Sequence, residues 1–366
     1  MKSYLLVVSL VFGHLAAQAC DQELQSFPRD CAIQDRYVSL KDRFAAQQIN
    51  IDEIAEYRVI RFVDRATWER AKEAQAKPKQ IYKPAPDTWL VWDSGIRDVM
   101  TNAGGKGGLN SYVLNEQTIS SINHSLLENN GMNTKDKNTD QSLKPGEFRK
   151  TTSIEVGFNA QRTDYSKSIS KSEASMDRFQ QKWEAAVGTT FSQILKDAGV
   201  EKYDGANFRS GMKQSDMGWV SYAESAKVPT EIQWIKTFIA TNLELYRKGT
   251  PALSPMELAA VVQKWFVSVH PFSDGNGRTS RAIQDIILAH FGMPFVPGGD
   301  LQEDATTEYE KYIESTYSKT ESILSQLELC QTSNAAIFQC QTLSTIDAMP
   351  DTPASLNFNK APSKKD

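Results

Sequence analysis

The residue types best suited to chemistry lie together in one segment of this chain, His270-Pro-Phe-Ser-Asp-Gly-Asn-Gly-Arg-Thr-Ser-Arg281. An imidazole titrates near neutral pH and can accept a proton. Glycines let a loop bring its backbone amides close to an anion, and arginines grip phosphate oxygens with paired N–H donors. The spacing therefore predicts an anion-binding loop that is directly preceded by a histidine.

Two helices are predicted to position this loop. Residues 254–257, Ser-Pro-Met-Glu, form a capping box with proline at the first helical position, so a helix begins there. It ends at His270 because Pro271 cannot continue a helix. A second helix is predicted over residues 278–291, followed by glycine and proline as a stop signal. The loop amides and the start of the second helix should then point at one spot that attracts anions.

The two arginines of the segment support a phosphate ligand. Arg278 and Arg281 are three residues apart on the first helical turn. Positive charges at a helix N-terminus oppose the helix dipole and cost stability. A bound polyphosphate would explain why both are there.

Two alternative sites are excluded by ligand chemistry. The letters Asp-Gly-Asn-Gly also occur in calcium-binding EF-hands, but placing Gly277 at the invariant sixth position puts Phe272 first and Ile283 last, where carboxylates are required. The glycine-rich residues 104–108 do not form a P-loop, because the lysine is followed by glycine and no strand precedes it.

The segment resembles the full signature of the Fic family, His-x-Phe-x-(Asp/Glu)-Gly-Asn-Gly-Arg-x-x-Arg, with every fixed position matched. The similarity extends to residues 259–260, 265–266 and 288–294 and is expected to cover about 100–325. It implies a mainly α-helical bundle with a short β-hairpin flap. A small mixed N-terminal region, which the resemblance does not explain, is expected in addition.

The resemblance also implies roles for individual residues. His270 would be the general base, Phe272 would anchor the loop in the core, and Asp274 would hold Mg²⁺ bridging the α- and β-phosphates. The positions that would cradle the phosphates and neutralise the departing pyrophosphate are Gly275, Asn276, Gly277, Arg278 and Arg281.

The flap of the family positions the acceptor segment of the target. One candidate lies between residues 208 and 229 and contains Gly218, Trp219, Val220, Ser221 and Tyr222. A competing candidate combines residues 146–149 with residues 151–158. The first is better placed relative to His270.

The activity implied is adenylyl transfer: AMP moves from ATP to a Ser, Thr or Tyr hydroxyl of a target protein, and pyrophosphate leaves. Relatives with similar loops transfer UMP, phosphocholine or phosphate, or remove AMP. Asp274 favours AMP transfer over bare phosphate transfer but leaves UMP and phosphocholine open. A non-catalytic nucleotide-dependent binding module is the alternative of another class, and the presence of both His270 and Asp274 speaks against it.

Many Fic enzymes are restrained by a helix of the form (Ser/Thr)-x-x-x-Glu-(Gly/Asn), whose glutamate pairs with the second arginine of the motif. Glu128 is followed by Asn129, but His124 stands in place of Ser or Thr. Glu155 has a threonine four residues before it, but valine follows and the stretch alternates like a strand. We therefore expect no restraint by an inhibitory helix.

The N-terminus is typical of a secretory signal peptide. Lys2 precedes apolar residues 5–12, and Ala17-Gln-Ala19 precedes Cys20, so cleavage is expected after residue 19. We expect a periplasmic or secreted protein. Lipid anchoring at Cys20 is disfavoured because it would leave an odd number of cysteines. Two disulfides are expected, with the pairing open among Cys20, Cys31, Cys330 and Cys340.

Four regions are expected: the signal peptide at 1–19, an N-terminal region of unknown role at 20–95, the Fic domain at 96–325, and a tail at 326–366 that is largely disordered after 341. Residues 57–63 read as a strand and residues 77–86 as a linker. Further helices are predicted over 114–128, 172–195 and 230–246.

Composition narrows the partners. A formal net charge of −4 gives no basic footprint for nucleic acid. No apolar run after the N-terminus is long enough to span a membrane. The resemblance implies ATP, Mg²⁺ and a protein target as the partners, and export leads us to expect that target in a host or prey cell.

Overall fold

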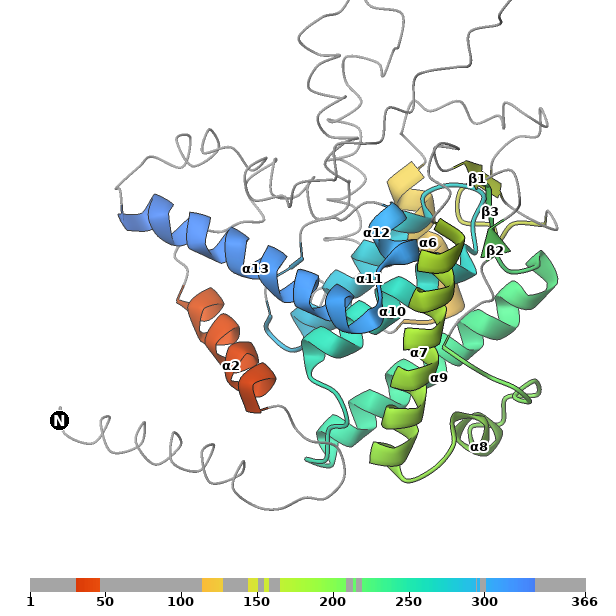
Figure 1. Ribbon diagram of the computed structural model, residues 1–366, viewed down its shortest axis with the longest axis horizontal. Coiled ribbons are helices and arrows are strands. Elements are labelled where there is room, and N and C mark those ends of the chain that lie inside the picture. The colour runs from red at the N-terminus through yellow and green to blue at the C-terminus, as the bar shows by residue number, and fades with distance from the viewer. Residues whose placement is uncertain are drawn as a thin grey trace, which may run out of the picture.

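The computed structural model describes residues 31–46, 114–127, 144–150, 155–157, 165–208, 213–214, 219–293, 295–296 and 301–332. Most of these residues are helical, which confirms the mainly α fold class (Figure 1). The helices are α2 (Cys31–Ala45), α6 (Glu116–Leu127), α7 (Tyr165–Val187), α8 (Phe191–Asp197), the short 3₁₀ turn η3 (Ser225–Lys227), α9 (Val228–Arg247), α10 (Pro255–Val269), α11 (Asn276–His290), α12 (Leu301–Thr306) and α13 (Tyr309–Thr332).

Several sequence predictions lie outside the described residues. These are the signal peptide, the strand at 57–63, the linker at 77–86, the glycine-rich residues 104–108 and the tail after 341. None of the described helices is both long and apolar enough to cross a bilayer.

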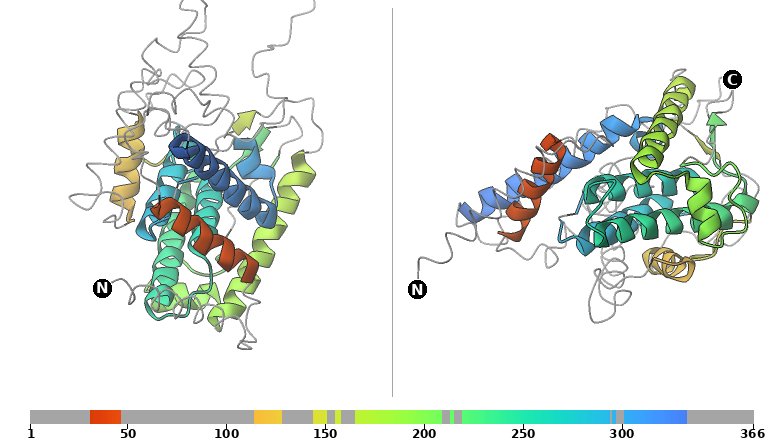
Figure 2. Two further views of the ribbon diagram at one scale, coloured as in Figure 1. Left: turned by 90° about the vertical axis from the view of Figure 1, so that its left-hand side faces the viewer. Right: turned by 90° about the horizontal axis from the view of Figure 1, so that it is seen from below.

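Helix α10 is the central element of the fold. All of its residues except Glu257 are buried, and it packs against α9, α11, α12 and α13. Its start follows the predicted capping box: the Ser254 hydroxyl accepts from the Glu257 amide at 3.2 Å, and the Glu257 carboxylate accepts from the Ser254 amide at 2.7 Å. Helices α6 and α7 lie on opposite sides of the α10–α11 pair (Figure 2).

The helix predicted over residues 172–195 is wrong in one respect, because the structure divides it into α7 and α8. Gly188 ends α7 with φ of 79°, a left-handed conformation that favours glycine. The Thr190 hydroxyl then accepts from the Gln193 amide at 3.2 Å and caps α8. The expected apolar stripe still faces the core, where it joins an aromatic cluster of Trp183, Phe191, Phe208, Phe238 and Trp265.

The region of unknown role contributes a helix to this core. Leu40 of α2 is buried, and Arg36 and Arg43 pair with Glu321 and Glu328 of α13 at 2.5 and 2.8 Å. Both pairs join residues 285 positions apart, so α2 and α13 run in the same direction. Neither helix was predicted from the sequence, and α13 continues past residue 325 to Thr332.

A small antiparallel sheet joins both flap candidates. Its strands are β1 (Glu155–Gly157), β2 (Lys213–Gln214) and β3 (Trp219–Ser221), in the order β1-β3-β2. Strands β2 and β3 form the hairpin expected between residues 208 and 229. Strand β1 comes from the competing segment, and it pairs with β3 through Glu155 opposite Ser221 and Gly157 opposite Trp219.

Candidate active site

His270 lies where α10 ends and the loop begins. It adopts φ of 51° and ψ of 58°, and it is the one non-glycine residue with positive φ in the described part of the chain. Its ring nitrogen Nδ1 is 3.3 Å from the Val267 carbonyl oxygen. A left-handed conformation is strained for a residue with a Cβ atom, so surrounding contacts must hold it.

The interior of the loop is fixed by Asn276 and Phe272. The Asn276 side chain accepts from the Phe272 amide and donates to the Phe272 carbonyl, both at 2.8 Å. The Phe272 ring is buried and packs 5.3 Å from Phe148 and 6.4 Å from Phe266, measured between ring centroids. The Asn276 side chain therefore shapes the loop, which leaves its backbone amide as the group suited to a phosphate.

Helix α6 supports the loop through Asn123. The Asn123 amide donates to the Asp274 carbonyl at 3.0 Å and to the Thr279 hydroxyl at 3.1 Å. Gly275, at the N-cap of α11, has φ of 76°, and a Cβ atom there would lie 2.9 Å from Asn123 Nδ2. Glycine is thus required both for the turn and for the approach of α6. The sequence analysis did not predict a role for Asn123. The signal that could have found it is a polar residue on the buried apolar face of α6.

At the other end of the loop, Arg281 is buried beside Asp304 of α12. Arg281 Nη2 lies 3.7 Å from Asp304 Oδ2, and the two residues are 5% and 1% exposed. The Asp304 carboxylate also accepts from Tyr312 at 2.9 Å and from Gln263 at 3.2 Å. Burial raises the pKa of Asp304, and the positive charge of Arg281 opposes that rise. Asp304 was also missed, because no local pattern marks it.

Asp274 and Arg278 form the more open part of the loop. Asp274 Oδ1 accepts from the Gly275 amide at 2.6 Å and lies 3.6 Å from Arg278 Nη2. The Asp274 side chain is 37% exposed. Gly277 follows, and a Cβ atom there would lie 3.2 Å from Arg281 Nη1, so its small size leaves room for that guanidinium.

The residues around Asp274 could hold Mg²⁺ only if a phosphate ligand supplied further oxygen atoms. Within the described ranges, no group of three or more His, Cys, Asp or Glu side chains is arranged to hold a metal. Mg²⁺ is commonly bound by one or two carboxylates, substrate phosphates and water. A single accessible carboxylate beside a phosphate loop suits that kind of site.

The flap covers His270. The Tyr222 ring, which directly follows β3, stacks on the His270 ring with 3.9 Å between centroids and 21° between planes. Burial, with a smaller contribution from the nearby Arg149 charge, lowers the pKa of His270 to about 3, although the contact with the Val267 carbonyl opposes this shift. The imidazole is therefore neutral at physiological pH, the state in which it can accept a proton.

The predicted flap residues have different positions. Trp219, Val220 and Ser221 form β3, Tyr222 reaches His270, and Gly218 lies outside the described residues. Because β3 is the middle strand, the outer strands of the described sheet are β1 and β2. A target that extends this sheet would pair with one of those two.

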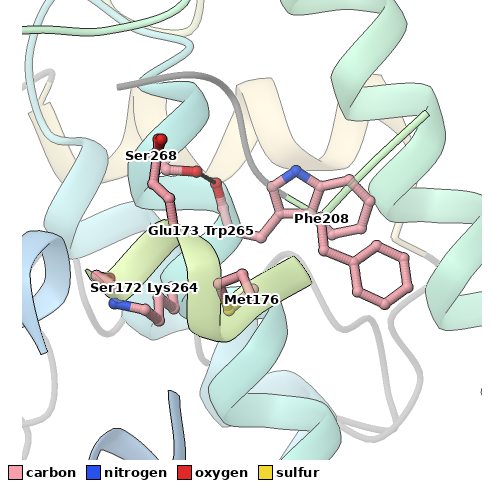
Figure 3. A pocket seen from close by; sticks show the side chains of 7 residues that line it. All are labelled: Ser172, Glu173, Met176, Phe208, Lys264, Trp265 and Ser268. Atoms are coloured by element: carbon pink, nitrogen blue, oxygen red, sulfur yellow. Dashed lines mark hydrogen bonds between the residues drawn. The ribbon is translucent and has the colours of Figure 1, made fainter. Parts of the chain in front are cut away.

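A small pocket lies between α7 and α10 and is lined by Trp265 and Ser268 among others (Figure 3). Its volume is about 10 Å³, and the Ser268 hydroxyl donates to the Trp265 carbonyl at 2.7 Å beside it. A void of this size holds about one water molecule. It has no room for a nucleotide.

Comparison with known proteins identifies the region around the loop. Residues 189–288 match the Fic/DOC family. Protein adenylyltransferase fic-1 of Caenorhabditis briggsae is 45% identical over 47 residues, which are 13% of this chain and 9% of that protein. Uridine 5'-monophosphate transferase of Xanthomonas campestris is 46% identical over 46 residues, again 13% of this chain and 9% of the relative.

Among solved structures, Fic-1 of Caenorhabditis elegans aligns with a TM-score of 0.46 and 13% identity, covering 91% of this chain and 79% of that one. This chain covers only 9% of the length of each of the two relatives named above.

Proposed function

This protein carries a Fic domain, and on that premise we propose that it is a protein adenylyltransferase, which moves AMP from ATP to a hydroxyl of another protein. The observation that carries the proposal is the loop between α10 and α11. It has a neutral, buried imidazole at one end and two arginines at the other, with glycine-borne amides between them.

The reaction follows from the chemistry of these groups. Neutral His270 takes the proton from the target hydroxyl, and the oxygen attacks the α-phosphorus of ATP. The bond to the β-phosphate oxygen breaks, and pyrophosphate leaves with the negative charge. The loop amides, Arg278 and Arg281 stabilise that charge as it develops. Mg²⁺ held by Asp274 would supply further charge neutralisation on the phosphates.

The target supplies a Ser, Thr or Tyr side chain. The oxygen must reach His270, whose ring is stacked beneath Tyr222. We place the acceptor segment against the flap, where an extended target could add to β1 or β2. Tyr222 would then turn aside to expose the imidazole.

The experiment is to incubate the protein with ATP or UTP and a lysate that contains candidate targets, then to identify the adduct by mass. An AMP adduct on a hydroxyl residue is expected. A UMP adduct would instead favour the activity for which the Xanthomonas relative is named. No adduct with either nucleotide would contradict the proposal.

We further propose that the protein is exported and acts where ATP is present, for example inside a host or prey cell. The support is the N-terminal pattern of Lys2, the apolar residues 5–12 and Ala17-Gln-Ala19. Protein recovered from an oxidising compartment should begin at Cys20 and contain no free thiol. An intact residue 1–19 segment, or four alkylatable cysteines, would contradict this.

A further inference from the structure

We propose that Arg149 is the positioning residue of His270: its guanidinium holds the backbone on which the imidazole is mounted and ties that backbone to the flap. The inference rests on the proposed function, because it assigns Arg149 a part in the same reaction. Arg149 lies outside the twelve-residue loop motif and more than a hundred residues before it.

The contacts of Arg149 converge on the end of α10. Its Nε donates to the His270 carbonyl at 2.7 Å, and its Nη2 lies 3.3 Å from the Val269 carbonyl. Nη2 also donates to the Ala223 carbonyl, at the end of the flap. The backbone amide of Arg149 donates to the Pro271 carbonyl at 2.9 Å. One residue thus bonds to three consecutive carbonyls around the base, and to the flap as well.

The sequence of the helix end explains why these donors are needed. The last carbonyls of a helix have no partner within it, and the Val269 carbonyl is one of these. Pro271 stops the helix from continuing past His270, so the carbonyls of residues 269–271 need donors from elsewhere in the chain. His270 also occupies a conformation that is unfavourable for a side chain with a Cβ atom. A buried donor from elsewhere in the chain satisfies the carbonyls and holds the strained cap.

Arginine suits this task better than lysine. The guanidinium is planar and offers donors in several directions at once, whereas lysine presents a single point of charge. Arg149 is only 4% exposed, so its bonds form away from water. Its positive charge also lies at the negative end of the α10 dipole, which favours it there.

Arg149 is itself held from two sides. Its neighbour Phe148 forms a bridge with Phe272 of the loop, and their rings are 5.3 Å apart. The turn before it needs Gly146, where φ is 80° and a Cβ atom would lie 2.8 Å from the Ser120 carbonyl oxygen of α6. The Gly146 amide donates to Asn123 at 2.9 Å. These contacts fix the approach of the guanidinium to His270.

The test compares Arg149→Lys and Arg149→Gln with a matched control, Arg178→Lys, in the full chain. Arg178 lies on α7 and makes only surface ion pairs with Glu308 and Glu310 at 3.7 and 3.9 Å among its described contacts. Misplacing a catalytic group by about 1 Å costs roughly 100-fold in rate. We expect both Arg149 variants to lose about that factor in kcat while the Kd for ATP stays within about twofold of the parent. The control should match the parent in both.

Two outcomes would overturn the proposal. AMP transfer by Arg149→Lys at the rate of the parent would show that the several N–H donors of the guanidinium are not needed. Loss of ATP binding or of cooperative unfolding together with transfer would show that Arg149 only supports the fold.

A spectroscopic measurement separates this inference from the proposed function. The imidazole resonances of His270 can be assigned in the parent by their disappearance in His270→Ala. If the parent transfers no AMP at all, the proposed function fails. The position of His270 is still tested, because Arg149→Lys should shift those resonances and Arg178→Lys should not. Unshifted His270 resonances in Arg149→Lys would contradict the positioning role.

Discussion

The two ends of the loop between α10 and α11 are built from opposite kinds of residue. At the His270 end, an aromatic ring covers the buried imidazole and the Arg149 charge lies nearby, so the base is kept uncharged. At the Arg281 end, the arginine lies against the buried carboxylate of Asp304. One end is arranged to keep a neutral proton acceptor, and the other to hold charge in place for an anion. Chemistry and nucleotide binding should therefore respond to different substitutions.

The largest effect is expected at the base end. His270→Ala should reduce transfer by about 100- to 10,000-fold, the usual contribution of general base catalysis. ATP binding should survive, because the amides and arginines of the loop remain. The measurements are adduct formation over time and ATP affinity by calorimetry. Equal transfer by variant and parent would remove His270 from the mechanism.

A second prediction concerns Glu231, the buried carboxyl of α9 that is electrostatically coupled to Arg149. Burial raises its pKa to about 7, although Lys227 and Arg149 lower it in part. The pKa of Glu231 is higher in the folded than in the unfolded protein. The stabilisation that this carboxyl contributes is therefore fully present below its unfolded pKa and is lost as pH rises through about 7. In Glu231→Gln no carboxyl titrates at this position, so the variant does not lose this stabilisation. The free energy of unfolding of the variant minus that of the parent should therefore increase by up to about 3 kcal/mol from pH 4.5 to pH 8.

Urea unfolding of the two proteins at both pH values measures that change. His270 titrates in parent and variant alike, so its contribution cancels in the difference. A difference that is the same at both pH values would mean that Glu231 does not titrate with a raised pKa, and it would contradict this prediction.

At the nucleotide end, Asp274→Ala should weaken ATP binding about tenfold in the presence of Mg²⁺, which corresponds to about 1.4 kcal/mol for a lost charged contact. Without Mg²⁺ the change should be small, because the carboxylate then meets the phosphates only by repulsion. Titrations with ATP in Mg²⁺ and in a chelator check this. The same loss under both conditions would contradict a metal role for Asp274.

The smallest effects are expected from Glu128→Gly and Glu155→Gly, neither of which should raise transfer appreciably. Glu155 lies in β1 opposite Ser221. Helix α6 lies against α11 and ends at Leu127, and Glu128 falls outside the described residues. Arg281, the arginine that an inhibitory glutamate would engage, is 3.7 Å from Asp304. A large gain from either variant would reveal an inhibitory element and contradict this expectation.

The sequence predicted the parts of the site that are specified locally. The capping box at Ser254, the stop at Pro271 and the glycines of the loop act within a few residues, and α10 and α11 have nearly the predicted limits. The hairpin of β2 and β3 was also placed, while its pairing with β1 joins two segments that had been treated as competitors.

What could not be predicted depends on contacts between distant parts of the chain. Asn123, Arg149 and Asp304 each meet the loop from another element, and a buried arginine or aspartate has no local pattern that distinguishes it from a surface one. Helices α2 and α13 were also missed, although apolar residues of both, among them Leu40, Leu324 and Leu327, lie in the core; α2 and α13 pack against each other from distant parts of the chain. The break at Gly188 was missed because the apolar stripe continues across it.

The most direct test of the central claim uses ATP labelled at the α-phosphate or at the γ-phosphate, with the parent and His270→Ala each incubated with the same target lysate. Adenylyl transfer retains the α-phosphate on the target and releases the γ-phosphate in pyrophosphate. The account predicts that the parent, compared with the lysate alone, adds label to protein from α-labelled ATP only, and that His270→Ala adds at least about 100-fold less. Label that the parent adds from γ-labelled ATP, or equal labelling by parent and variant, would contradict it.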